Sequence, residues 1–190
     1  PNPKPQTPNP ELIIVYRVEI IMDKRILKKA KTGDSRVDSL VLAYKNNAMG
    51  AVFLCFFSYA QAESRLKTAL SLSPEGFTYV NCYINLGNLY SQRREYRLAW
   101  EAYGEGLRGS RWGGGGGVEA NSLDPDLSSD SFDSKEAYIA GLMNGGCCLI
   151  NIGEAEKALE LIEKGLLMDP DNVEMRINMG GVMRQLGQRE

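Results

Sequence analysis

The chain has 190 residues, of which 43% are hydrophobic, and its net charge at pH 7 is -2. This length and composition suffice for a buried core in one or two domains, and the charge argues against a dedicated nucleic-acid-binding protein, whose surface would be strongly basic. Histidine is absent, which excludes Ser-His and Cys-His catalytic pairs and every metal site that contains histidine.

The four cysteines, at positions 55, 82, 147 and 148, form no C-x-x-C pair. They are typical of reduced thiols, so we expect an intracellular protein, most simply a cytoplasmic one. The sequence begins at Pro1 rather than at a methionine, and we expect it to be a fragment of a longer chain.

Residues 1–10 contain five prolines and are predicted to be an extended tail. Residues 11–42 are predicted to be a mainly helical segment. Within it, residues 12–22 (LIIVYRVEIIM) also alternate as a half-buried strand does, but a single strand would have no partner in a helical protein. We expect the basic run at residues 24–29 to be the solvated face of the same helix.

Residues 48–62 are apolar enough to raise the question of a membrane span. Their uncharged run is shorter than the roughly 20 residues that a span requires, so we predict a core helix.

Residues 43–113 contain two copies of one pattern of small and apolar residues, in a register that aligns Gly50 with Gly87. The second copy is the clearer one. The first copy departs from the pattern at Phe56-Phe57, because the turn between two helices is expected to carry glycine or a polar residue there. The matching residues are Gly50, Ala62, Leu66, Ala69 and Pro74 in the first copy and Leu86, Gly87, Tyr90, Ala99 and Tyr103 in the second.

The third copy aligns Gly146 with Gly87, and the interval between these glycines is longer than one repeat. The extra residues, 114–138, are rich in Gly, Ser and Asp and are predicted to be a flexible insertion between two hairpins. The glycines at 113–117 lack the Lys and Ser/Thr of a phosphate-binding loop, so they predict no nucleotide site.

Residues 139–190 are predicted to hold a third repeat and the first helix of a fourth. Asn144 and Asn178 are separated by the same interval as Gly146 and Gly180. This interval matches the period of about 34 residues that is typical of a helical hairpin array. Pro170 is predicted to end one helix, and Asp171, with Glu174 three residues later, to cap the next.

The repeated pattern resembles the tetratricopeptide repeat family. The third copy shows it as Leu142, Gly145-Gly146, Leu149, Ala158, Ile162 and Pro170. The resemblance covers residues 43–113 and 139–190. It implies an all-α fold, a right-handed α-solenoid of stacked helix-turn-helix hairpins, whose first helices line a concave groove.

The resemblance also implies which residues would contact a partner. In the family, the asparagine two residues before the first-helix glycine lines the groove and bonds the backbone of an extended peptide. The matching residues are Asn85, Asn144 and Asn178, and their replacement is expected to weaken binding with little change in the thermal midpoint. An asparagine tolerated at the surface would give the same pattern. Further candidates for the groove are Asn81, Ile84, Asn88, Gln92, Met143 and Cys147.

Two specific chemistries are disfavoured. The chaperone-binding version of the family grips a carboxylate with Lys and Arg, whereas the corresponding places here hold Asn47, Ala51, Ala140 and Asn144. Cys147 and Cys148 are adjacent, so on a helix they point about 100° apart and are predicted to be small buried hydrophobes rather than metal ligands.

We therefore predict a non-catalytic scaffold or adaptor that binds a protein or peptide segment in its groove. We expect no cofactor, metal, membrane, nucleic-acid or small-molecule partner. The alternative is a substrate-recruiting arm of a larger transferase whose catalytic domain lies beyond residue 190. A helical-repeat RNA binder would need more Lys and Arg on the inner helices, and absence of binding to single-stranded RNA at low salt would remove it.

Overall fold

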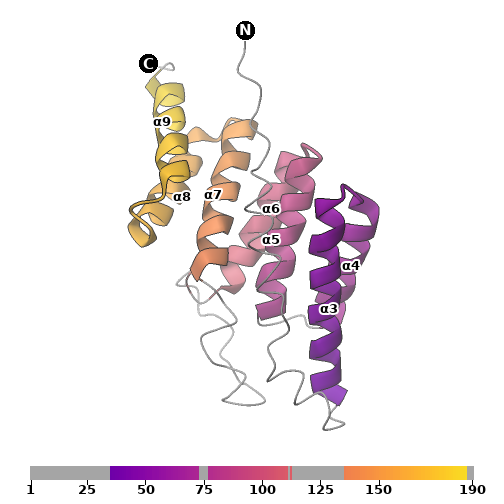
Figure 1. Cartoon of the computed structure of the whole chain (residues 1–190). Coiled ribbons are helices and arrows are strands. Elements are labelled where there is room, and N and C mark those ends of the chain that lie inside the picture. Colours follow the sequence, from indigo (N-terminus) through magenta and orange to yellow (C-terminus); the bar gives the residue numbers. More distant parts are fainter. Residues whose placement is uncertain (1–34, 73–76, 111, 113–134, 188–190) are drawn as a thin grey trace.

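The computed structural model describes residues 35–72, 77–110, 112 and 135–187, and in these residues the protein consists of seven α-helices with no strand. The predicted all-α class is thus confirmed for the described part of the chain (Figure 1). The helices are α3 (Ser35–Cys55), α4 (Tyr59–Leu72), α5 (Phe77–Gln92), α6 (Tyr96–Gly109), α7 (Lys135–Ile152), α8 (Ala155–Met168) and α9 (Val173–Gly187).

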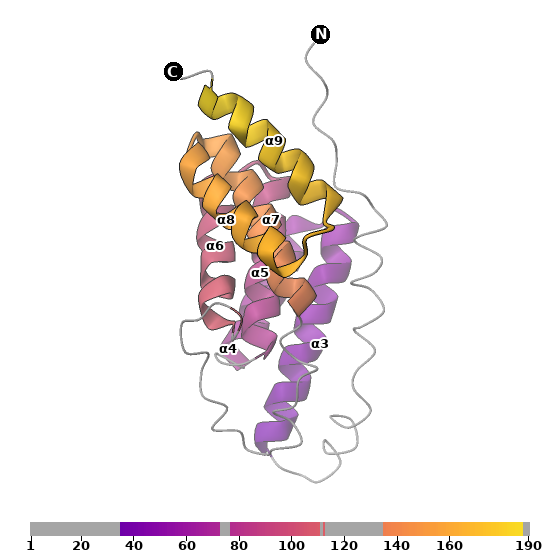
Figure 2. The ribbon, with the colours of Figure 1, turned by 90° about the vertical axis from the view of Figure 1, so that its left-hand side faces the viewer.

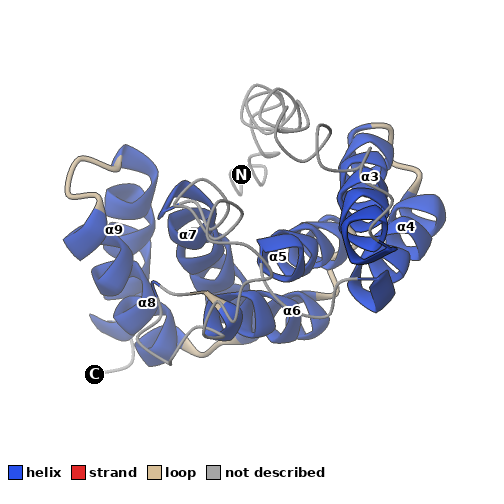
Figure 3. Ribbon diagram, turned by 90° about the horizontal axis from the view of Figure 1, so that it is seen from below, coloured by secondary structure: helices blue, strands red, loops and turns tan. Residues whose placement is uncertain are grey.

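Each helix packs against the next one in the chain, so α3 with α4, α5 with α6 and α7 with α8 form three antiparallel hairpins, followed by α9. Figure 2 looks along this array from the α9 end. The first helices also contact one another in the order α3, α5, α7, α9. Seen along the helices, the array is an arc with these four on its inner side and α4, α6 and α8 on its outer side (Figure 3).

The three hairpin turns have the same backbone structure. Phe57 and Arg94 have positive φ angles of 56° and 62°, and Gly153, at the equivalent place, has a φ of 87°. In each turn the next residue donates its N–H to a carbonyl five residues earlier, with N···O distances of 2.9, 2.8 and 2.9 Å for Ser58, Glu95 and Glu154. This is the Schellman ending of a helix, and it recurs in the register that aligns Gly50, Gly87 and Gly146.

Each hairpin is closed by a glycine of its first helix against a large side chain of its second. A Cβ added to Gly50 would lie 2.7 Å from Leu66 Cγ, and one added to Gly146 would lie 3.1 Å from Ile162 Cγ1. Gly87 lies against Tyr103 in the same way. The neighbouring alanines Ala62, Ala99 and Ala158 are 0% exposed. Small residues at the repeated positions therefore bring the two helix backbones together.

The core is continuous from hairpin to hairpin because each hydrophobic cluster draws on consecutive pairs. The first cluster joins Leu66 and Ala69 of α4 to Leu86 and Leu89 of α5. The second joins α5 and α6 to Cys148 of α7. The third joins α7 and α8 to Met175 and Val182 of α9. No hairpin buries its apolar face alone, which is the physical reason that such units stack.

Several boundaries differ from the predicted ones. α3 begins at Ser35, within the segment 11–42 that is predicted to be helical, and α7 begins at Lys135, within the predicted insertion. Residues 135–138, the end of the predicted insertion, thus belong to a helix, where Ala137 and Tyr138 are both 1% exposed. Predictions for residues 1–34 and for most of 114–138 lie outside the described residues.

The predicted cap of α9 was wrong by one residue. The side chain that accepts the Met175 N–H, at 3.0 Å, is that of Asn172 and not that of Asp171. Asn172 directly precedes the helix and so occupies the N-cap position, while Asp171 lies one residue too early.

The question of a membrane span is answered for the seven described helices. None of them combines the length and the apolar character that crossing a bilayer requires.

Candidate functional site

The three asparagines implied by the resemblance occupy equivalent places on successive inner helices. Asn85 lies on α5, Asn144 on α7 and Asn178 on α9, each two residues before a repeat glycine. All three side chains are half-buried. They therefore lie at the seams between neighbouring inner helices rather than standing free in solvent.

Each of these amides donates a hydrogen bond to the preceding inner helix. Asn144 Nδ2 donates to Asn88 Oδ1 at 3.0 Å, and Asn178 Nδ2 donates to Cys147 Sγ at 3.2 Å. Asn88 and Cys147 both follow a repeat glycine directly, so the two bonds are in the same register. The structure thus brings four of the predicted residues together as two bridges between helices.

The bridge between α3 and α5 is displaced by one helical turn relative to these two. Asn85 Nδ2 donates to Asn47 Oδ1 of α3 at 2.9 Å, and the Cys82 thiol donates to the same oxygen at 3.4 Å. The equivalent of Asn88 on α3 is Ala51, which has no acceptor in its side chain. Asn47 is 6% exposed, and its place in a mostly apolar helix was a signal for a buried polar role that the sequence reasoning did not use.

Asn88 also ties the inner layer to the outer one. Its Oδ1 accepts a 2.7 Å hydrogen bond from the Tyr103 hydroxyl of α6, in addition to the bond from Asn144. Tyr103 is 1% exposed and is the same residue that packs against Gly87. One amide oxygen therefore connects α5, α6 and α7.

The remaining candidates fall into two groups. Ile84 is 4% exposed and packs with Val80, Ala99 and Tyr103, so it belongs to the core and is not accessible to a partner. Asn81, Gln92 and Met143 are half-buried. The Oε1 atom of Gln92 is buried and accepts no hydrogen bond from any described residue.

Cys147 and Cys148 are free thiols, as are Cys55 and Cys82. Burial raises the pKa of Cys147 to about 11, helped by the charge of Glu174 and opposed by the Asn178 hydrogen bond. Burial also raises the pKa of Cys148 to about 12. Both thiols are protonated at neutral pH, so Cys147 acts as a neutral acceptor in its bridge. Among the described residues, no group of three or more His, Cys, Asp or Glu residues lies together as a metal site would require.

The middle of the inner layer carries almost no charge. α5 (Phe77–Gln92) contains no Asp, Glu, Lys or Arg, and α7 contains only Lys135 and Glu136, in its first turn. Charged residues of the inner layer are otherwise confined to the flanking helices α3 and α9. The polar side chains in the middle of α5 and α7 are therefore neutral, and amides are prominent among them.

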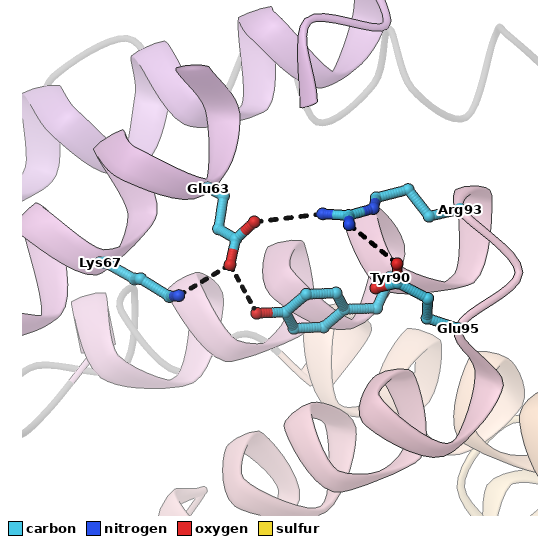
Figure 4. Close-up of polar contacts among 5 residues, drawn as sticks. All are labelled: Glu63, Lys67, Tyr90, Arg93 and Glu95. Atoms are coloured by element: carbon cyan, nitrogen blue, oxygen red, sulfur yellow. Dashed lines mark hydrogen bonds and ion pairs between the residues drawn. The ribbon is translucent and has the colours of Figure 1, made fainter. Parts of the chain in front are cut away.

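In addition to the amide bridges, a charged bridge joins the first two hairpins (Figure 4). The Glu63 carboxylate of α4 accepts bonds from Lys67 Nζ at 2.7 Å, Tyr90 Oη at 3.0 Å and Arg93 Nη1 at 3.2 Å, and Arg93 Nη2 pairs with Glu95 at 2.8 Å. The hydrogen bond from Lys67 lowers the pKa of Glu63, against the effect of burial, and Tyr90 and Arg93 lower it further. The sequence reasoning missed this bridge because its members come from two different hairpins.

Comparison with known proteins adds no assignment, since no protein-family model and no curated protein matches this chain.

Proposed function

We propose that the protein is a right-handed tetratricopeptide-type solenoid that acts as an interaction scaffold, holding an extended peptide segment of another protein along the inner side of its arc. The proposal gives the chain a binding role and no catalytic one. It is supported by the helical hairpin array and by the amides that recur on its inner helices.

The single observation that carries the proposal is the uncharged, amide-lined middle of the inner layer. α5 has no charged residue, and Asn85 and Asn144 lie at its two seams. A surface of this kind offers no charged group to pair with a phosphate or a carboxylate. It offers paired donors and acceptors, which match the N–H and C=O groups of a peptide main chain.

Among the described residues, each bridge uses only part of the hydrogen-bonding capacity of its amide. Asn85, Asn144 and Asn178 each use an Nδ2 donor toward the preceding helix. An amide group has two donors and an oxygen with two lone pairs, so a second donor and the oxygen remain. Because the bridge fixes the side chain, less conformational entropy is lost when the peptide binds.

The test uses peptide display with the full chain to select binding peptides, followed by calorimetry on the best one. We expect an affinity that changes less than about threefold between about 50 mM and 500 mM NaCl, because no ion pairs form. Asn144→Ala is expected to weaken binding by about tenfold, the equivalent of ~1.4 kcal/mol. Gln61→Ala, which removes an exposed amide on the outer helix α4, is the matched control and should leave the affinity unchanged.

Two results would overturn the proposal. One is the selection of strongly charged peptides whose affinity collapses with salt. The other is equal weakening by Asn144→Ala and Gln61→Ala, which would place the contact away from the inner side. Binding is measured well below the unfolding temperature of each variant, so that a loss of stability is not mistaken for a loss of contact.

A further inference from the structure

An apolar stripe runs along the solvent side of α3. Leu42, Met49, Val52 and Phe56 are 49%, 42%, 43% and 66% exposed. Leu42, Met49 and Val52 are spaced by seven and three positions, which puts them on one face of α3, and Phe56 directly follows the last residue of the helix. Four large apolar side chains in a row are a larger exposed feature than the single apolar residues normal on a protein surface. We call these four residues the α3 stripe.

The repeat register shows what the stripe is equivalent to. When Gly50 is aligned with Gly87, Met49 and Val52 correspond to Leu86 and Leu89 of α5, which are 4% and 0% exposed. These two leucines pack in one cluster with residues of the preceding helix α4. The middle of the α3 stripe, at Met49 and Val52, therefore corresponds to the face of α5 on which the preceding helix lies.

The equivalent positions on α7 are buried as well. When the alignment is continued to Gly146, Leu42 and Val52 correspond to Tyr138 and Cys148 of α7, each 1% exposed. Met49 corresponds to Gly145, where an added Cβ would lie 3.3 Å from the Trp100 ring of the preceding helix α6. At the positions of Met49 and Val52, a helix that comes just before in the chain therefore lies on this face in both later repeats.

We propose that residues 12–27 of the same chain cover the α3 stripe, lying antiparallel to α3 in the place that α4 takes against α5. These residues lie outside the described part of the chain, so the argument rests on their sequence and on the stripe. Their sequence, LIIVYRVEIIMDKRIL, has eleven apolar residues among sixteen. It is the most apolar stretch before α3 and needs a surface to bury against.

Length and connection fit this occupant. The stripe from Leu42 to Phe56 is about 21 Å long at about 1.5 Å per residue, and a helix over residues 12–27 would be about 24 Å long. Residues 28–34 can span up to roughly 23 Å, enough for the chain to reverse before Ser35. A segment tethered by so short a connection has an effective concentration in the millimolar range, which favours it over a second copy of the protein.

The test is photo-crosslinking in the full chain. A benzophenone amino acid replaces Val52 in the stripe and, as the matched control, Leu98 of α6, which is 47% exposed outside the stripe. We expect the Val52 probe to give a product of monomer mass, crosslinked to peptides within residues 12–27, and the Leu98 probe to give no such product. A product of dimer mass, which would identify a second copy, overturns the proposal, as does a Val52 probe with no crosslink to residues 12–27.

A second measurement does not depend on crosslinking chemistry. In the full chain, Val52→Asp would bury a charge under the covering segment, so the thermal midpoint is expected to fall by about 3 °C or more. Leu98→Asp, at nearly the same exposed fraction, should leave it nearly unchanged. Equal midpoints for the two variants overturn the proposal. Neither result depends on the peptide-binding function proposed above.

Discussion

Gly87 of α5 lies so close to Tyr103 of α6 that a Cβ on the glycine would lie 2.7 Å from Tyr103 Cζ, whereas a Cβ on Gly180 of α9 would meet nothing within 4 Å. The two glycines are at equivalent places in the repeat, but only one of them has a second helix packed against it in the described structure. Replacing each glycine therefore distinguishes two effects on stability: the steric need for a small residue, which applies only at Gly87, and the low helix propensity of glycine, which applies at both.

We predict that Gly87→Ala and Gly180→Ala have opposite effects on stability. Gly87→Ala forces the buried Tyr103 ring to move, and overpacking costs about 1–3 kcal/mol, more than the roughly 1 kcal/mol gained from helix propensity. Gly180→Ala keeps only the gain, about 0.5–1 kcal/mol. Urea unfolding of both variants measures the difference, and a shift of the same sign in both would refute the packing argument.

The bridge between Asn144 and Asn88 predicts a cost in stability that the sequence alone did not suggest. Asn144→Ala removes a 3.0 Å inter-helix hydrogen bond and is expected to lower the free energy of unfolding by about 0.5–1.5 kcal/mol. Asn151→Ala on the same helix is the control, because Asn151 is exposed and its side chain donates to Cys147 O of its own helix. A double-mutant cycle with Asn88→Ala should show coupling, and strict additivity would argue against the bridge.

The charged bridge at Glu63 predicts a pH-dependent stability. The pKa of the Glu63 carboxyl is lower in the folded protein than the ordinary value of 4.5. The contribution of Glu63 to the free energy of unfolding is therefore present above pH 4.5 and is lost as the pH falls through the folded pKa. Wild type and Glu63→Gln should therefore differ most at pH 7 and converge below pH 4.5.

Urea unfolding of both proteins from pH 7 to pH 3 measures this convergence. Glu160→Gln, at an exposed carboxylate of α8, is the control and should track wild type throughout. A constant difference between wild type and Glu63→Gln down to pH 3 would show that the bridge acts through packing rather than charge.

The hairpin turns predict a stabilising substitution. Arg94 is an exposed non-glycine residue with a φ of 62°, a conformation that costs roughly 1–2 kcal/mol for an L-residue. Arg94→Gly removes this cost but adds freedom to the unfolded chain, so we expect a net gain of about 0.5–1 kcal/mol.

Gly153→Ala tests the same geometry in the other direction. The φ of Gly153 is 87° and an added Cβ would meet nothing within 4 Å, so only the backbone conformation opposes the change. We expect a loss of about 1 kcal/mol or more. Thermal unfolding of both variants is sufficient, and destabilisation by Arg94→Gly would contradict the assignment.

The hairpins were predictable from sequence because their packing is local. Gly50 and Leu66, or Gly146 and Ile162, belong to adjacent helices, so a small residue and a large one at fixed spacing encode the contact directly. The turn at Phe57 was the exception in its residue type, yet its backbone has the same left-handed conformation as Gly153.

The contacts between hairpins were less predictable, because they depend on how far one helix slides along the next. Spacing placed Asn85, Asn144 and Asn178 on equivalent positions, but only the stacked helices show that the first amide bonds Asn47 one turn away while the other two keep register. The same holds for Ile84, which the resemblance makes a candidate for the groove and which the packing of α6 and α7 on α5 buries.

The lack of charged residues in α5 has a kinetic consequence. Without a local field to steer diffusion, a segment arriving at this helix would associate at an ordinary rate of about 10⁵–10⁷ M⁻¹ s⁻¹, with little acceleration in dilute buffer. Competing segments would then differ mainly in their dissociation rates, so the dissociation half-life is the quantity that would distinguish a specific ligand from a non-specific one.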